Sequence, residues 1–271
     1  MPDDVLAPLV DLPGVTEAIE RARAAVDSVL WDRAMRQRAS DIAARSQLRG
    51  AWATSAIDGA EVRPDALVSG EALDGSPIGN VVAAACALQA EIPRNVDTFG
   101  KAPLQVISRL HAVVSVDFVS ADDRGRVRTE READDPLRLP DLPKAAEAAA
   151  RLTALSRLLV APTTAPALVV AAVAHAEIAV TRPFAWGSGL VARAMTRLVC
   201  ASRGVDPDCW TVSEAGIFAA GRPKYTAALR AYQSATPEGL AEWLILHADA
   251  VRVGADESRR IFVDLPAAGT T

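Results

Sequence analysis

The stretch TRPFAWGSGLVAR, Thr181 to Arg193, is the most informative part of this sequence. An aromatic residue is followed by two glycines one residue apart, and then by a helical pattern that carries an arginine. Glycine turns at a helix start are typical of phosphate-binding loops, because they expose backbone N–H groups where the helix dipole is positive. Yet Arg182, Trp186 and Leu190 stand where acid–base or metal chemistry would need a histidine or a carboxylate.

Most of the remaining chain has a helical pattern. Half of the 271 residues are hydrophobic but only 4% are aromatic, and the alanines that fill the difference suit closely packed helices. A polar stretch at 118–140 reads as a loop with a short hairpin around Val127. Apolar residues recur at helical spacing over 15–38, 40–57, 64–73, 77–92, 103–117, 144–160, 166–180, 187–203, 213–221, 223–231 and 237–261.

Composition argues against several classes of function. The net charge is -5, with 29 basic and 34 acidic side chains and no basic block, so we expect no nucleic-acid partner. The most apolar run contains His175 and Glu177 and is too short to span a bilayer, so no membrane association is expected. The acidic start does not resemble a signal peptide, and three cysteines without a CxxC pair indicate neither disulfides nor a metal site. A cytoplasmic protein is expected.

The stretch 182–193 resembles the signature of Fic (Fido) domains. That signature reads His-Pro-Phe, any residue, Asp or Glu, Gly-Asn-Gly-Arg, two further residues, and Arg. The positions that match in register are Pro183, Phe184, Gly187, Gly189 and Arg193. The positions that depart from it are Arg182 for histidine, Trp186 for the acid, Ser188 for asparagine and Leu190 for the first arginine.

Other segments resemble the same family in the correct order. LQVISRLHAVV followed by RGRVR is similar to the helix and flap entry, and VVAAVAHAEIAVTRPF to the helix before the signature. ATSAIDGAEV resembles an N-terminal inhibitory motif, with Thr54 and Gly59 in place and Asp58 for its glutamate. The resemblance implies an all-α Fic/Fido helical fold with a small β-hairpin-like flap. It also implies a helical extension at 1–46, a Fic-like domain at 47–262 and a loose tail at 263–271.

The resemblance implies a chemistry that this signature does not support. Active Fic proteins transfer AMP from ATP to a protein hydroxyl, using the histidine as base and the acid to hold magnesium. Arg182 has no lone pair with which to accept a proton, and Trp186 offers no oxygen to a metal ion. His175 lies seven residues earlier, about 10 Å away along a helix, and is expected to be a packing residue. We therefore expect no catalytic residue and no metal site.

Binding without chemistry is compatible with the same residues. The turn Gly187, Ser188 and Gly189, together with Arg193 and Arg182, is expected to be more positive than the family site. ATP or ADP without magnesium is a candidate ligand. The alternative is that the turn merely caps a structural helix.

The inhibitory motif gives a further expectation. Asp58 and Arg193 are expected to form a partly buried inhibitory-type pair, unless Asp58 belongs only to an Asp-Gly turn.

Three functions remain open from the sequence. The first is a Fic-domain pseudoenzyme that binds a protein partner through the flap region, or a phosphate-bearing ligand. The second is an active Fic-type nucleotidyltransferase with altered chemistry, for protein AMPylation or a related transfer. The third is a structural protein without a ligand. Homo-oligomerisation is compatible with each.

Overall fold

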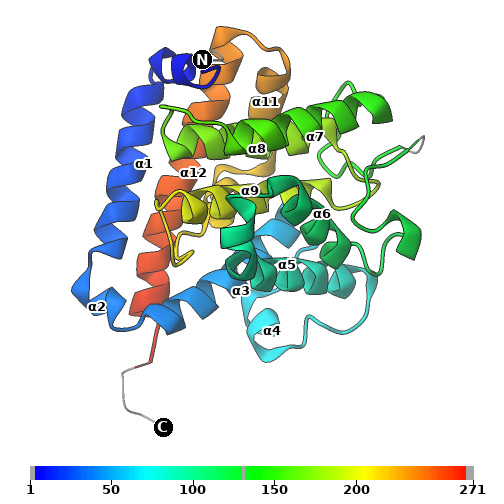
Figure 1. Cartoon of the computed structure of the whole chain (residues 1–271). Coiled ribbons are helices and arrows are strands. Elements are labelled where there is room, and N and C mark those ends of the chain that lie inside the picture. The colour runs from blue at the N-terminus through cyan, green and yellow to red at the C-terminus, as the bar shows by residue number, and fades with distance from the viewer. Residues whose placement is uncertain (1–3, 130–131, 267–271) are drawn as a thin grey trace.

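A computed structural model describes residues 4–129 and 132–266. All regular elements within these residues are helices (Figure 1). In chain order they are η1 (Ala7–Asp11), α1 (Val15–Leu30), α2 (Arg33–Arg36), α3 (Ala39–Ile57), α4 (Pro64–Ser69), α5 (Pro77–Phe99), α6 (Pro103–Val114), η2 (Ala121–Asp123), α7 (Ala145–Val160), α8 (Ala167–Thr181), α9 (Ser188–Ser202), α10 (Ser213–Ala220), α11 (Arg222–Gln233) and α12 (Pro237–Val263). The predicted all-α class is confirmed.

Helix α8 lies at the centre of the molecule. Almost every one of its side chains is buried, which is the pattern of a helix surrounded by others. The short loop 182–187 joins α8 to α9, and the two helices pack side by side (Figure 1). Helices α7, α11 and α12 cover the rest of α8, while α3, α5 and α6 pack against α9. The two helices that the signature loop joins are therefore held by the rest of the bundle.

Helix α3 brings the N-terminal part of the chain against α9. A Cβ added at Gly50 would lie 2.6 Å from Arg197 Nη2, so a glycine is needed for this close approach. Further along α3, Thr54 and Asp58 reach the start of α9. On the outside of the bundle, α1 packs along α12 (Figure 1). The close contact between α3 and α9 positions the inhibitory-type motif next to the signature.

The predicted helix at 15–38 is wrong in one respect, because it is two helices. It breaks after Trp31, and the Asp32 carboxylate accepts hydrogen bonds from Ala34 N at 2.8 Å and Met35 N at 3.1 Å. An aspartate in this position is a strong N-cap, so it starts the new helix α2. The predicted helix at 64–73 ends early, at Gly70, which has φ of 86°.

The flap segment is irregular where the structure describes it. Outside the undescribed residues 130–131, the stretch 118–140 contains η2 but no strand, so the predicted hairpin is not seen. Of the predicted tail at 263–271, Val263 ends α12, and 267–271 lie outside the described residues. Along the described parts of the chain, no helix has both the length and the apolar character needed to cross a bilayer.

Candidate functional site

The loop between α8 and α9 contains two left-handed residues. Gly187 has φ of 75° and is the N-cap of α9, a conformation that glycine adopts without strain. Arg182, at the C-terminal end of α8, has φ of 44°, which costs a non-glycine residue about 1 to 3 kcal/mol. Its carbonyl accepts a hydrogen bond from Arg128 Nε at 2.8 Å, and Arg128 N donates to Pro183 O at 2.8 Å. The flap segment thus holds this strained backbone in place.

The Arg182 side chain points into the flap segment. Its Nη1 donates to Asp135 Oδ2 at 2.6 Å and to Leu139 O at 2.9 Å, and its Nη2 donates to Pro140 O at 3.0 Å. The side chain is only 4% exposed. Arg182 therefore acts as an internal clamp between α8 and the flap segment.

Aromatic contacts hold the rest of the loop. Trp186 stacks on Phe118 with ring centroids 3.6 Å apart and planes 3° apart. Phe184 stacks on His111 at 4.0 Å and 7°. Burial lowers the pKa of His111 to about 4, and its neutral Nδ1 accepts a hydrogen bond from Gly125 N at 3.0 Å. The indole of Trp186 is thus part of an apolar contact with the residues after α6.

The hydroxyl of Ser188, between the two glycines of the turn, is hydrogen-bonded to the backbone of the same loop. Ser188 Oγ accepts from Phe184 N at 3.1 Å and donates to Phe184 O at 3.3 Å. Ser188 is buried, and so is Leu190, which stands for the first family arginine. A Cβ added at Gly189 would lie 3.2 Å from Arg193 Nη1 and 3.3 Å from Asp58 Oδ2. The second glycine of the turn therefore leaves room for a charged pair.

Asp58 and Arg193 form that pair. Arg193 Nη2 lies 2.6 Å from Asp58 Oδ2, and the two side chains are 1% and 10% exposed, respectively. Arg193 Nε also donates to Thr54 Oγ1 at 2.5 Å, and Nη2 to Thr54 O at 3.2 Å. Asp58 Oδ1 and Arg193 Nη1 are buried and have no hydrogen-bond partner in the part of the chain that is described. The pair ties the end of α3 to α9 but leaves one atom of each partner unsatisfied.

A chain of buried polar groups lies behind Arg193. Tyr225 Oη is 2.7 Å from His175 Nε2, whose Nδ1 is 3.3 Å from Thr196 Oγ1, and Thr196 Oγ1 is 3.0 Å from His247 Nε2. Burial lowers the pKa of His247 to about 3 and that of His175 well below its usual value, and it raises the pKa of Tyr225 to about 12. His175 is thus a neutral residue of the core, remote from the glycine turn.

A cavity of about 310 Å³ lies over the turn. Two carboxylates line it, those of Asp58 and Asp134, whereas neither Arg182 nor Arg193 does. Desolvation, together with the nearby carboxylates of Asp58 and Asp135, raises the pKa of Asp134. The charged side chains of the described residues that line this cavity are acidic, because the structure directs Arg182 to Asp135 and Arg193 to Asp58.

Comparisons with known proteins identify the fold. No sequence profile of a protein family matches the chain, and no curated protein matches it. Among solved structures, a Fic family protein from Desulfovibrio desulfuricans matches with a TM-score of 0.68 at 15% identity, over 94% of this chain and 77% of that chain. Fic-1 from C. elegans matches with a TM-score of 0.64 at 18% identity, over 93% and 74%. The chain has the Fic fold.

The residues present do not fit the nucleotide and magnesium of active Fic proteins. Trp186 supplies no oxygen ligand for the metal and is stacked on Phe118. Arg193, the arginine expected to hold the terminal phosphate, is bonded to Asp58. Asp58 and Asp134 face the cavity over the turn and would repel a triphosphate.

Three residues that shape this Fic-fold site were not assigned a role from the sequence. Asp135 clamps Arg182, Asp134 gives the cavity its charge, and Phe118 covers Trp186. All three lie in the polar stretch 118–140, where acidic and basic residues are mixed and follow no regular spacing. The sequence offered no signal for Asp135, because the burial of Arg182, which requires an acidic partner, is visible only in the structure.

Proposed function

We propose that this Fic-fold protein does not transfer nucleotides and acts by binding another protein. The observation that carries the proposal is Arg182, in the position of the family base. A guanidinium stays protonated at any working pH and cannot accept the proton of an attacking hydroxyl. Here its N–H groups are also bonded to Asp135 and to two backbone carbonyls of the flap.

The remaining signature side chains support the same proposal. Trp186, Ser188 and Arg193 each make internal contacts that stabilise the loop or join it to α3. General-base assistance alone contributes roughly 10²- to 10⁴-fold in rate, and the metal site would have to be replaced as well. A Fic loop whose side chains all serve the fold is better suited to a scaffold than to a transferase.

The charge of the cavity favours a protein partner over a phosphate-bearing ligand. Backbone N–H groups at the start of α9 attract anions, but Asp58 and Asp134 line the same cavity. Two carboxylates at close range oppose a phosphate, and both internal arginines are already neutralised by acids. A partner bound through the flap, with the predicted hairpin formed in the complex, remains part of the proposal.

Label transfer from α-labelled nucleotides tests the proposal. The wild-type protein is incubated with each nucleotide, magnesium and a cell lysate, and compared with Asp58→Ala, which releases Arg193. We expect no labelled protein with either form, because releasing the arginine restores neither a base nor a metal ligand. A masked transferase would differ, since Asp58→Ala would then increase labelling.

A second measurement separates a protein-binding scaffold from a nucleotide receptor. Thermal melts are recorded with ATP or ADP, with and without magnesium. A ligand at about 100 times its Kd stabilises a protein by about 2.7 kcal/mol, so binding would be visible as a higher Tm. We expect no change in Tm. A higher Tm with ATP or ADP that is lost in Gly189→Ala would contradict the proposal, because it would show that the cavity over the turn binds a nucleotide.

A further inference from the structure

A cavity of about 730 Å³ lies between the end of the flap segment, at 135–138, and the outward face of α11. We call it the α11 groove. Of the described residues that line it, Pro136 alone also lines the cavity over the glycine turn, and none belongs to the signature at 182–193. The α11 groove is therefore a site that the signature does not account for.

The α11 side of the groove is one face of the helix. Arg222, Thr226 and Arg230 follow one another at intervals of four residues, which places them on the same side of α11. Tyr225 and Leu229, on the other side, are buried in the core. The two arginines are exposed and start about 12 Å apart along the helix, with the smaller Thr226 between them.

The flap backbone holds both of these arginines. Arg222 Nη2 donates to Pro136 O, and Arg230 Nη2 donates to Arg138 O at 3.1 Å. A guanidinium has several N–H donors, so one such bond leaves most of them for other acceptors. Because the two carbonyls differ, the two positive charges are kept at separate places along the groove.

Arg138 adds a third positive charge from the flap side. Its φ is 52°, a left-handed conformation that glycine adopts without strain and arginine does not. Its side chain is exposed and makes no hydrogen bond or ion pair with the described residues. The contacts of the fold thus give no reason for an arginine at position 138.

The charges that line the α11 groove are unbalanced. Arg138, Arg222 and Arg230 have no carboxylate partner in the described part of the chain. The acid of the groove, Asp135, lies 2.6 Å from the buried Arg182 and is neutralised by it. Even if Asp135 is counted and Arg182 is left out, three arginines minus one carboxylate leave an excess of two positive charges.

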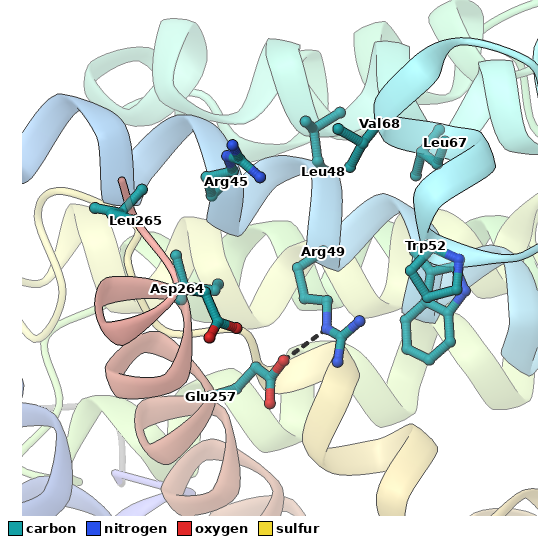
Figure 2. A pocket seen from close by; sticks show the side chains of 11 residues that line it. Arg45, Leu48, Arg49, Trp52, Leu67, Val68, Glu257, Asp264 and Leu265 are labelled. Atoms are coloured by element: carbon teal, nitrogen blue, oxygen red, sulfur yellow. Dashed lines mark hydrogen bonds and ion pairs between the residues drawn. The ribbon is translucent and has the colours of Figure 1, made fainter. Parts of the chain in front are cut away.

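The cavity between α3, α4 and the end of α12 shows the opposite case. Figure 2 shows Arg49 reaching from α3 to Glu257 on α12. Arg45 and Asp264 line the same cavity, so two arginines face two carboxylates and the charges balance. Of these two cavities, the α11 groove is the one whose charge selects an anionic ligand.

The arrangement of the charges favours an acidic peptide over a phosphate compound. A phosphate is bound best where several donors converge on it, whereas Arg222 and Arg230 are held at separate places. A long polyanion that extended past Pro136 would meet the carboxylates of Asp58 and Asp134, which repel it. In an extended peptide, alternate residues lie on one side about 7 Å apart, so separate carboxylates can reach separate arginines.

We propose that the α11 groove binds an extended acidic segment of a partner protein, whose aspartate or glutamate side chains pair with Arg138, Arg222 and Arg230. The proposal rests on the part of the proposed function that gives the protein a protein partner, and it names the chemistry of that partner. It does not depend on the loss of transfer chemistry, because the described residues that line the groove lie outside the signature.

Selection from a library of displayed random peptides on the full-length protein tests the groove. We expect the selected peptides to be rich in aspartate and glutamate, and a synthetic copy to bind more weakly as salt is added. Arg222→Gln combined with Arg230→Gln should weaken its binding about fivefold. The matched control is Arg21→Gln with Arg157→Gln, two exposed arginines of α1 and α7 without an ion pair to the described residues, which should bind as wild type does.

Variants at position 138 separate ligand binding from support of the flap. Arg138→Gly keeps the left-handed turn without strain, so its Tm should be no lower than that of wild type, while the acidic peptide should bind about twofold more weakly. Arg138→Glu should weaken the acidic peptide further, and it should bind a peptide with lysine in place of the acids better than wild type does. An arginine that only supported the fold would not exchange the preference in this way.

The proposal is overturned if no acidic peptide is selected, or if Arg222→Gln with Arg230→Gln binds that peptide as tightly as wild type does. Peptides of another kind that bind elsewhere would overturn the groove but leave the protein partner of the proposed function in place. The proposal is also overturned if inorganic phosphate or ATP raises the Tm and the double variant loses this effect, because the groove is then a phosphate site.

Discussion

Helix α9 carries two buried arginine–carboxylate pairs one turn apart, and they differ in completeness. Arg197 Nε lies 2.8 Å and 3.1 Å from the two oxygens of Glu214, and its Nη1 and Nη2 donate to Cys209 O and Ser46 O. Gln89 Nε2 donates to Glu214 at 2.8 Å. The side chains of Arg197 and Glu214 are 2% and 0% exposed, respectively. Two buried charges are tolerated when they are paired and their remaining donors and acceptors are hydrogen-bonded, as they are in this pair.

The pair between Arg193 and Asp58 is incomplete. Arg193 Nη1 and Asp58 Oδ1 are buried without a partner among the described residues, and Asp58 lines the cavity over the glycine turn. The acid is one methylene shorter than the glutamate of the motif that it resembles. The comparison shows one buried pair whose hydrogen bonding is complete, between Arg197 and Glu214, and one that leaves an atom of each partner unsatisfied, between Arg193 and Asp58.

Removing Glu214 should have the largest effect. Glu214→Ala leaves Arg197 as an uncompensated buried charge and Gln89 without its acceptor, so we expect a loss of about 3 to 5 kcal/mol of unfolding free energy, measured in denaturant. In the control, Arg197→Met with Glu214→Leu removes both charges and should recover most of the loss. A single variant as stable as wild type would show that the pair contributes nothing.

Asp58→Ala should destabilise the protein less, by about 3 kcal/mol at most. Arg193 keeps its two hydrogen bonds to Thr54, and Asp58 is already 10% exposed. The comparison requires Asp58→Ala to be milder than Glu214→Ala when both are measured under the same conditions. If Asp58→Ala loses more unfolding free energy than Glu214→Ala, the stability that each pair contributes does not depend on how completely it is hydrogen-bonded.

Sequence reasoning predicted the helices well because their start signals are local. Ser76 and Thr236 accept hydrogen bonds from Gly79 N and Gly239 N, and each is followed by a proline at the first helical position. The break at Asp32 was missed because apolar periodicity continues through it to the buried Met35. A capping carboxylate interrupts a helix without interrupting its hydrophobic pattern.

The site was only partly predictable from the sequence. The residues of the loop were identified because a motif fixes their spacing, but the direction of Arg182 was not. That direction depends on Asp135, which lies 47 residues away, in a loop without periodicity. Nor does Glu214 stand out in the sequence, although it meets Arg197 inside the core. Partners brought together by tertiary packing leave no mark in local patterns.

Acid should lower the free energy of unfolding of the protein, because three histidines are buried in its core. Burial lowers the pKa values of His111, His175 and His247, so the native state keeps these rings neutral while the unfolded chain protonates below pH of about 6.5. The unfolded state then binds more protons, and stability falls as the pH falls. We expect a loss of about 2 to 3 kcal/mol between about pH 6.5 and 5.5.

Denaturant unfolding at a series of pH values measures this loss. His247→Gln removes one of the three titrating groups, so the slope of unfolding free energy against pH should decrease by about one third. An unchanged slope in this variant would show that His247 titrates alike in the folded and unfolded chain. A parent protein whose stability is flat over this range would contradict the assignment for all three rings.

Lengthening the acid at position 58 should have the smallest effect, and the only favourable one. Asp58→Glu allows both carboxylate oxygens to reach Arg193, whose Nη1 lacks a partner, and one added charged hydrogen bond contributes about 1 kcal/mol. The room for it depends on Gly189, where a Cβ would lie 3.3 Å from Asp58 Oδ2. Thermal melts should therefore show a higher Tm for Asp58→Glu alone and no gain when Gly189→Ala is added. A lower Tm for the single variant would mean that the incomplete pair has no space to be completed, and that aspartate is the longest acid this Fic-fold core accepts.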